Sequence, residues 1–219
     1  PWHMMNEWGV PTLYIASLTY NYVHKLASKG QYVPDIILAG GFAFEDDIFK
    51  AMALGAPYVK AVGMARSPLC AAHVGKLVAE QINKNAIDKT IEPYGKTTDE
   101  IFVLASRVKR LFGSKGKEVP AGALGVYSYY QRLSQGLRQL MCGSRKFALE
   151  YLTRDDVVTL TRDAAEVTGL KYIMEADSEE AEQILMGKEK TKSKIVAKVK
   201  PKATSKPRAK AKDKGKKKK

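Results

Sequence analysis

The sequence predicts an α/β fold built on a parallel sheet, and the order of its apolar segments leads to this prediction. Two apolar runs, residues 35–41 and 56–63, end in glycine and are too short for helices. Segments with apolar side chains at helical spacing lie before, between and after these runs, over 12–30, 45–55 and 67–85. Such an alternation requires a parallel sheet whose strands are joined by right-handed crossovers.

The boundaries of these first elements follow from local signals. The helix over 12–30 ends at Gly30, a common helix stop, and the run that follows it is rich in Ile and Leu. A short, uninterrupted apolar run of this kind predicts a fully buried parallel strand. The helix before this strand, over 12–30, has large apolar side chains at helical intervals. They are Leu13, Leu18, Tyr22, Val23 and Leu26.

The two helices after the strands carry clear start signals. The helix over 45–55 has acidic residues in its first turn, where the helix dipole favours them, and Gly55 as its stop. The helix over 67–85 has Ser67 as the expected N-cap and Pro68 at its first position.

Three further helices are predicted beyond residue 85. Apolar spacing predicts a single amphipathic helix over 97–113, capped by Thr98. The segment 125–147 predicts another, whose apolar stripe is expected to be core. That stripe comprises Tyr127, Tyr130, Leu133, Leu137, Leu140 and Met141. A helix over 153–169 is expected to start with a capping box, to end at a glycine, and to carry Arg and Asp side chains as a solvated, mutually paired face.

The net positive charge of the chain comes from its last segment. The 219 residues carry a formal charge of +14, and residues 187–219 hold 15 Lys and one Arg against two acidic residues, which also gives +14. This tail has no aromatic residue and few large apolar ones, so we expect it to be disordered. It is interpreted either as a solvating extension or as a polycation that binds nucleic acid or other polyanions without sequence preference.

Composition also bears on the environment of the protein. No window approaches the roughly 20 apolar residues of a membrane span, so none is expected. The two cysteines, Cys70 and Cys142, lie far apart and fit a reducing cytoplasm rather than a metal site. Cys70 is expected to be a small buried apolar residue. Because the chain opens without an initiator Met or a signal peptide, we expect it to be a piece of a longer protein.

The glycines that end both strands suggest a binding site for an anion. In parallel α/β folds, ligands bind at the carboxyl ends of the strands, and phosphates often meet glycine-rich turns and a helix N-terminus there. Gly40 and Gly41 follow the first strand and Gly63 ends the second, with a helix start just beyond. A tight turn alone also explains such glycines, so the pattern leaves both interpretations open.

The segment "AGGFAFEDDIFKAMALGAPYV" resembles the seventh strand and helix of FMN-binding barrels. The matching positions after the glycine pair are Asp47, Lys50, Ala51, Leu54, Gly55 and Ala56. The opening "PWHMMNEWGVPTLY" resembles the segment after the sixth strand of the glutamate synthase central domain. The stretch over 136–177 is similar to the carboxyl-terminal portion of short glutamate synthase-like proteins. The resemblance to the FMN-binding glutamate synthase family covers about residues 1–177.

This resemblance implies a division of the chain into three parts. Residues 1–84 would be the end of an FMN-binding (β/α)8 TIM barrel, with its strands seven and eight. Residues 85–186 would be a helical carboxyl-terminal extension, and 187–219 the disordered basic tail. Strands one to six, the ring contacts of the flavin and the catalytic residues would lie outside this chain, so its catalytic residues stay unassigned.

The implied function is an FMN-dependent oxidoreductase of glutamate synthase type, acting on CH–NH2 donors and forming glutamate from 2-oxoglutarate and an amino donor. The resemblance assigns FMN phosphate binding to two loops. These residues are Gly40, Gly41, Phe42, Gly63, Met64, Ala65 and Arg66. The second loop departs from the family's usual endings, and its alignment can slide by two residues.

Electron supply is expected to come from elsewhere. Full-length glutamate synthases hold an iron–sulfur cluster through three closely spaced cysteines after strand eight, where this chain has only Cys70. One thiolate cannot hold a cluster. A separate electron donor or amidotransferase subunit is therefore an expected partner, beside the small-molecule substrate. The alternative hypothesis is a non-catalytic binding module that its Lys-rich tail tethers to anionic polymers.

Overall fold

The computed structural model of the chain describes residues 8–187. Among these, residues 8–176 belong to one compact unit and 177–187 to a second. Within the second unit, helix α9 (Ser178–Leu185) has acidic residues in its first turn. The predictions for the basic tail fall, beyond Gly187, outside the described residues. In the described part of the chain, no helix is both long and apolar enough to cross a bilayer.

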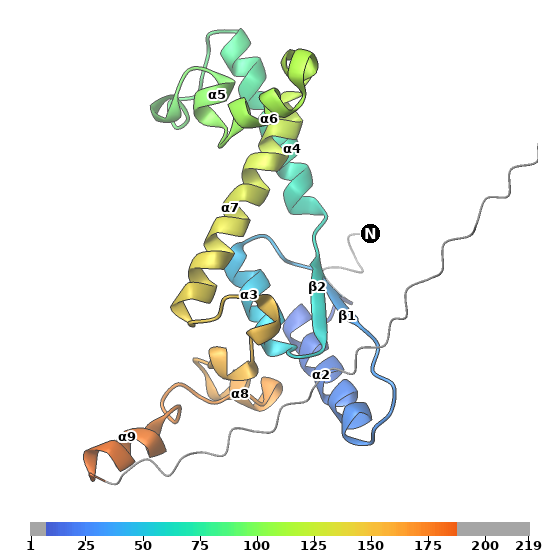
Figure 1. Cartoon of the computed structure of the whole chain (residues 1–219), viewed down its shortest axis with the longest axis vertical. Helices are drawn as coiled ribbons and strands as arrows, with labels where there is room; N and C mark the ends of the chain where they lie inside the picture. Colours follow the sequence, from blue (N-terminus) through green and yellow to red (C-terminus); the bar gives the residue numbers. More distant parts are fainter. Residues whose placement is uncertain (1–7, 188–219) are drawn as a thin grey trace, which may run out of the picture. The chain divides into compact units, whose positions relative to one another are not determined.

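The first unit begins with the predicted alternation of helices and strands (Figure 1). The elements are α2 (Thr12–Ser28), β1 (Ile36–Ala39), α3 (Glu45–Leu54), β2 (Val59–Gly63) and α4 (Arg66–Asn83). The two strands pair in parallel, which confirms the predicted sheet type. Among the described residues the sheet has two strands and the unit is otherwise helical, so the barrel stays a prediction.

Helix α3 starts and ends at the residues that the sequence marks as a helix start and a helix stop. Asp47 Oδ2 accepts hydrogen bonds from the backbone N–H groups of Ala43 and Phe44, each at 3.0 Å, and so caps the helix start. Acidic side chains fill the first turn, where the positive end of the helix dipole stabilises them. The helix ends at Gly55 as predicted, and that glycine packs so closely on Val59 that a Cβ would lie 2.1 Å from its side chain.

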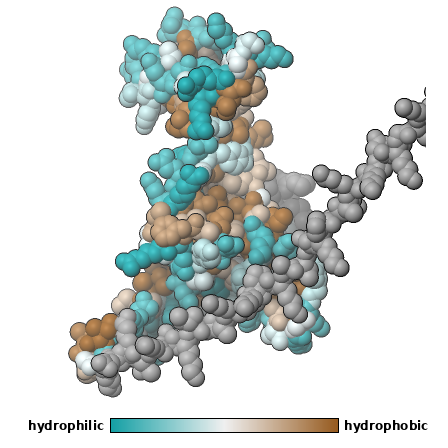
Figure 2. Space-filling model, in the orientation of Figure 1, coloured by the Kyte–Doolittle hydropathy of each residue, from teal (hydrophilic) through white to brown (hydrophobic). Residues whose placement is uncertain are grey.

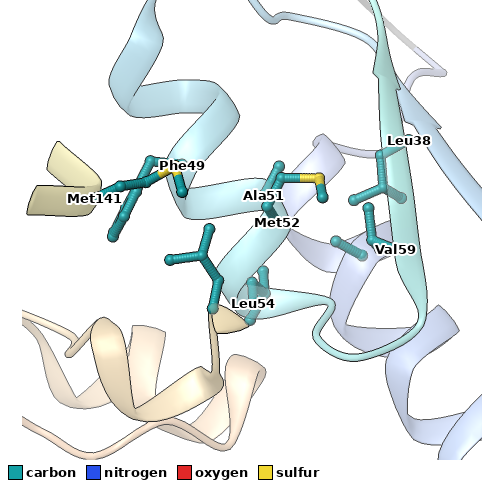
Figure 3. Packing of buried hydrophobic residues seen from close by; sticks show 9 residues of the cluster. Leu38, Phe49, Ala51, Met52, Leu54, Val59 and Met141 are labelled. Carbon is teal, nitrogen blue, oxygen red and sulfur yellow. The ribbon is translucent and has the colours of Figure 1, made fainter. Parts of the chain in front are cut away.

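A core that we call the strand cluster packs α3 against one face of the sheet (Figure 3). Phe49 of α3 lies beside Met141 of α7 (Ala121–Gly143), while Leu38 and Val59 project from the two strands towards Met52. The cluster comprises Ala16, Leu38, Phe49, Ala51, Met52, Leu54, Val59, Met141 and Leu152. Burial of these side chains supplies the main driving force for folding of this part.

The prediction of a fully buried first strand is wrong. Leu38 of β1 is buried, but its neighbour Ile37 is 66% exposed. Successive strand residues face opposite sides of a sheet, and only one face of this sheet carries the strand cluster. Helix α2 likewise buries the small Ala16 and Ser17 with Val23, and leaves exposed three of the apolar side chains singled out from its spacing. These are Leu13, Leu18 and Tyr22.

The remaining helices form a second core, the helix cluster, around the pair α4 and α7 (Ala121–Gly143). These two long helices lie side by side, with α5 (Thr98–Ile101) and α6 (Ala105–Leu111) near one end and α3 against the other end of α7 (Figure 1). Glycines bring the pair close, because a Cβ on Gly125 would lie 2.4 Å from the Ala71 carbonyl oxygen. The buried members of the cluster are Val78, Phe102, Ala105, Val108 and Leu124.

The prediction of a single helix over 97–113 is wrong. The segment forms α5 (Thr98–Ile101) and α6 (Ala105–Leu111), separated by Leu104 in the left-handed backbone region at φ 58°. The break allows Phe102 to enter the helix cluster. The N-cap of α5 is Thr97 rather than the predicted Thr98, and a capping box links Thr97 with Glu100. A 3-10 helix, η1 (Glu92–Tyr94), precedes this segment and another, η2 (Gly113–Glu118), follows it.

The stripe predicted as core on 125–147 is confirmed in part. Leu133 and Met141 of α7 are buried, whereas Tyr130 is 45% exposed. A 3-10 helix, η3 (Leu149–Tyr151), follows α7. Apolar side chains also reach the surface over the middle of the face that Figure 2 shows.

The helix predicted over 153–169 is shorter than expected. The capping box of Thr153 and Asp156 is confirmed, but it starts only the 3-10 helix η4 (Arg154–Asp156). Helix α8 (Arg162–Thr168) begins later and ends at Gly169, as predicted. Between the two helices, residue 159 forms a parallel bridge with residue 172, which requires extended backbone.

The contacts of Arg154 contradict the prediction that the Arg and Asp side chains over 153–169 form a solvated, mutually paired face. Its guanidinium donates hydrogen bonds to the carbonyl oxygens of Leu54, at 2.6 Å, and of Thr168. The same group lies 3.9 Å from the centre of the Tyr20 ring. Arg154 therefore joins the last segment of the unit to α3 and α2.

Candidate functional site

The two strands end at the same edge of the sheet. Ala39, the last residue of β1, pairs in register with Gly63, the last residue of β2. The loops that follow therefore leave the sheet side by side and enclose a cavity of about 760 Å³. Its lining includes all seven residues predicted to bind the phosphate of FMN. They are Gly40, Gly41, Phe42, Gly63, Met64, Ala65 and Arg66.

The glycines of the first loop have conformations that other residues rarely adopt. Gly40 and Gly41 have φ values of 121° and 79°, in the region that favours glycine. A Cβ on Gly40 would also lie 3.1 Å from Oγ1 of Thr12, whose hydroxyl donates a hydrogen bond to the Gly40 carbonyl. Gly63 has a different role, since a Cβ added to it would lie 3.2 Å from the Cβ of Ala39. It permits close approach of the strands.

Backbone amides are the hydrogen-bond donors that this loop offers to a ligand. The amides of Ala43 and Phe44 already donate to Asp47. No described residue accepts a hydrogen bond from the amide of Gly41 or Phe42. Successive amides in a glycine-containing turn form a concave site for anions, so this loop can bind a phosphate oxygen.

The second loop leads directly into α4. This helix begins at Arg66 after Ala65. The amides at its start have no intrahelical partner, as in any α-helix, and no side chain caps them. The prediction that Ser67 is the N-cap is wrong, because the helix starts two residues earlier and Pro68 is its third residue. Ser67 instead donates a hydrogen bond from Oγ to the Phe42 carbonyl, at 3.0 Å, and so joins the two loops.

The charged groups near the cavity are few. Arg66 lines it with an exposed side chain, which leaves the guanidinium accessible to a phosphate. On α3, Lys50 forms an ion pair with Asp46 at 2.6 Å, and the hydrogen bond from Lys50 lowers the pKa of the Asp46 carboxyl. Asp47 is occupied by the loop amides. Arg66 is thus the cationic side chain that the described lining provides.

Cys70 lies at the rim of the same cavity and is exposed, so the prediction of a buried apolar residue is wrong. Its thiol and that of Cys142 are both free. Among the described residues, no group of three or more His, Cys, Asp or Glu side chains is placed to hold a metal ion.

Tyr129 of α7 belongs to the lining and was missed by the sequence analysis. Its hydroxyl donates a hydrogen bond to the Ala43 carbonyl at 2.5 Å, across 86 positions of sequence. Burial raises the pKa of the Tyr129 hydroxyl above its ordinary value. The stripe that spacing assigned to the core includes the neighbouring Tyr127 and Tyr130. No signal in the sequence marked the tyrosine between them.

A second cavity, of about 440 Å³, lies at the opposite end of the sheet, near the start of β2. Its polar side chains are Lys60 and Glu150, and its lining contains no glycine and no start of an α-helix. The cavity at the carboxyl ends of the strands is therefore the stronger candidate for a ligand site.

No family model, curated protein or solved structure matches this chain.

Proposed function

We propose that this chain supplies the phosphate-binding end of an FMN-dependent oxidoreductase of glutamate synthase type. The observation that supports the proposal best is the convergence of both predicted loops on one cavity between parallel strand ends. Strand ends of this kind are where α/β folds bind phosphates. The donors are the amides of Gly41 and Phe42, the start of α4, and Arg66.

The residues present fit the phosphate end of FMN. The glycine conformations leave the first loop without side chains at two successive positions, so backbone amides can approach an anion closely. The helix start contributes the positive end of its dipole, and Arg66 contributes a full charge. FMN, when bound, supplies the redox chemistry, and the role of this chain is to bind and orient the phosphate.

The incomplete sheet is consistent with a larger barrel. Among the described residues neither outer edge of the two strands pairs with another strand, and Ile37 is exposed on the open face. Parallel sheets normally have both faces covered. We propose that six further strands of a (β/α)8 barrel complete the sheet and carry the ring contacts and catalytic residues.

The proposed substrate is 2-oxoglutarate with an amino donor, in a cytoplasmic enzyme. A separate electron donor or an amidotransferase subunit would deliver the reducing equivalents or the ammonia. The single thiol at the site, Cys70, cannot hold an iron–sulfur cluster alone.

An NMR titration tests the proposed phosphate site. We expect FMN and inorganic phosphate to shift the amide signals of Gly41, Phe42 and Ser67 in the 15N-labelled chain, with affinity weaker than micromolar because the ring contacts are missing. Riboflavin, which lacks the phosphate, should leave these signals unchanged. Arg66→Gln should weaken phosphate affinity about threefold to tenfold, because an exposed cation contributes less than a buried charge-assisted hydrogen bond. Equal shifts with riboflavin, or none with phosphate, would contradict the proposal.

The basic tail favours one alternative function, a module that binds anionic polymers. Residues 187–219 hold the whole formal charge of the chain. Deletion of 188–219 separates the two functions: under our proposal it abolishes retention on heparin and leaves the phosphate-induced shifts at Gly41 and Phe42 intact. Loss of those shifts on deletion would favour the alternative.

A further inference from the structure

The first loop is fixed by contacts on both sides of two successive peptide groups. In the peptide between residues 42 and 43, Ser67 donates to the carbonyl and Asp47 accepts from the amide. In the next peptide, Tyr129 donates to the Ala43 carbonyl and Asp47 again accepts from the amide. Because C=O and N–H of a trans peptide point in opposite directions, each plane is held at both ends.

The locked peptides determine the orientation of those that precede them. The open amides belong to Gly41 and Phe42, directly before the locked pair. Two consecutive glycines lose more conformational freedom on ordering than any other pair of residues. An anion site built from them is therefore effective only if a neighbouring anchor has already ordered the chain.

We infer that Tyr129 is a positioning residue for the phosphate-binding loop, which it holds from helix α7 through the Ala43 carbonyl. This inference rests on the proposed function, because it assigns Tyr129 to the same site. It also gives the helical segment beyond α4 a role at the site. Ser67 and Asp47 come from elements adjoining the loops, whereas Tyr129 comes from a helix that packs against α3 and α4.

Adjacent tyrosines provide a matched pair of variants. Tyr129→Phe removes the hydroxyl and keeps the ring, and Tyr130→Phe makes the same change one residue away. Tyr130 is 45% exposed, and its hydroxyl makes no hydrogen bond to a described residue. Amide hydrogen exchange at Ala43 and Phe44 reports the order of the loop without any ligand. A titration with inorganic phosphate reports the site.

We expect Tyr129→Phe to accelerate exchange at Ala43 and Phe44 about threefold to tenfold, the effect of one lost hydrogen bond. The phosphate affinity should fall by a similar factor. Exchange inside α3, at Met52 for example, should stay unchanged, as should both readouts in Tyr130→Phe.

Two results would overturn the inference. One is equal exchange in the Tyr129 and Tyr130 variants, and the other is acceleration by the same factor in the loop and throughout α3, which would indicate a general structural role. Absence of any phosphate response in the unmodified chain would refute the proposed function, while the exchange readout would still decide whether Tyr129 orders the loop.

Discussion

The strand cluster and the helix cluster differ in how completely they satisfy their own backbone. Helices α4 and α7 make their hydrogen bonds internally and pack through glycines around Leu124, which is 2% exposed. Strands β1 and β2 pair with each other along one edge, and one face of their sheet leaves Ile37 open. Parallel strands need neighbours on both sides, whereas helices do not. Among the described residues the helix cluster is thus closed, while the two-stranded sheet keeps both outer edges unpaired and one face open.

The largest expected effect comes from truncating the centre of the helix cluster. Leu124→Ala should lower the free energy of unfolding by about 2–5 kcal/mol, because it removes a fully buried side chain and leaves a cavity. The matched change on the open sheet, Ile37→Ala, should alter it by less than about 0.5 kcal/mol. Urea unfolding of both variants measures the difference. Equal costs would show that the sheet face is covered and would remove the contrast.

The close approach of α4 and α7 gives the next largest effect. Gly125→Ala should cost about 1–3 kcal/mol, because the added methyl would lie 2.4 Å from a backbone carbonyl oxygen and the helices would have to separate. Gly143→Ala, at the end of the same helix, has no atom within 4 Å of its Cβ and should be neutral or slightly stabilising. Thermal unfolding of the two variants tests this; a neutral Gly125→Ala would mean that the helices are not in close contact.

The smallest effect concerns the capping box at the edge of the helix cluster. Backbone hydrogen bonds, that from Lys96 first, lower the pKa of Glu100 below its ordinary 4.5. A lowered pKa in the folded state means that the stabilisation is present above pH 4.5 and is lost as the pH falls through the folded value. Amide shifts of Lys96 and Thr97 should therefore follow the titration of Glu100 and lose this pH response in Glu100→Gln. If the pH response of these amide shifts persists in Glu100→Gln, another titrating group causes it.

Much of the fold on the strand side was predictable from local signals. The positions of β1, α3 and β2 follow from short apolar runs bounded by glycines, and the parallel pairing follows from their alternation with helices. Burial was not predictable, because the apolar run of β1 looks the same whether one face or two are covered. Periodicity likewise could not foresee the turn at Leu104, which places Phe102 in the helix cluster.

The candidate site was predictable in its loops and not in its supports. Glycines at strand ends indicated where Gly40 and Gly63 would meet, and the structure gathers them around one cavity. The partners of these loops depend on tertiary packing. Ser67 was expected as a helix cap but bonds the other loop, and Tyr129 reaches Ala43 from a distant helix. Hydrogen bonds between segments far apart leave no periodic trace in one sequence.

The length of α7 has a consequence for unfolding. Its 23 residues span about 35 Å at 1.5 Å per residue, and its side chains enter both clusters, Leu124 near one end and Met141 near the other. Neither cluster can lose its packing on this helix without weakening the other, so residues 8–176 should denature in one cooperative transition, the same by fluorescence and circular dichroism.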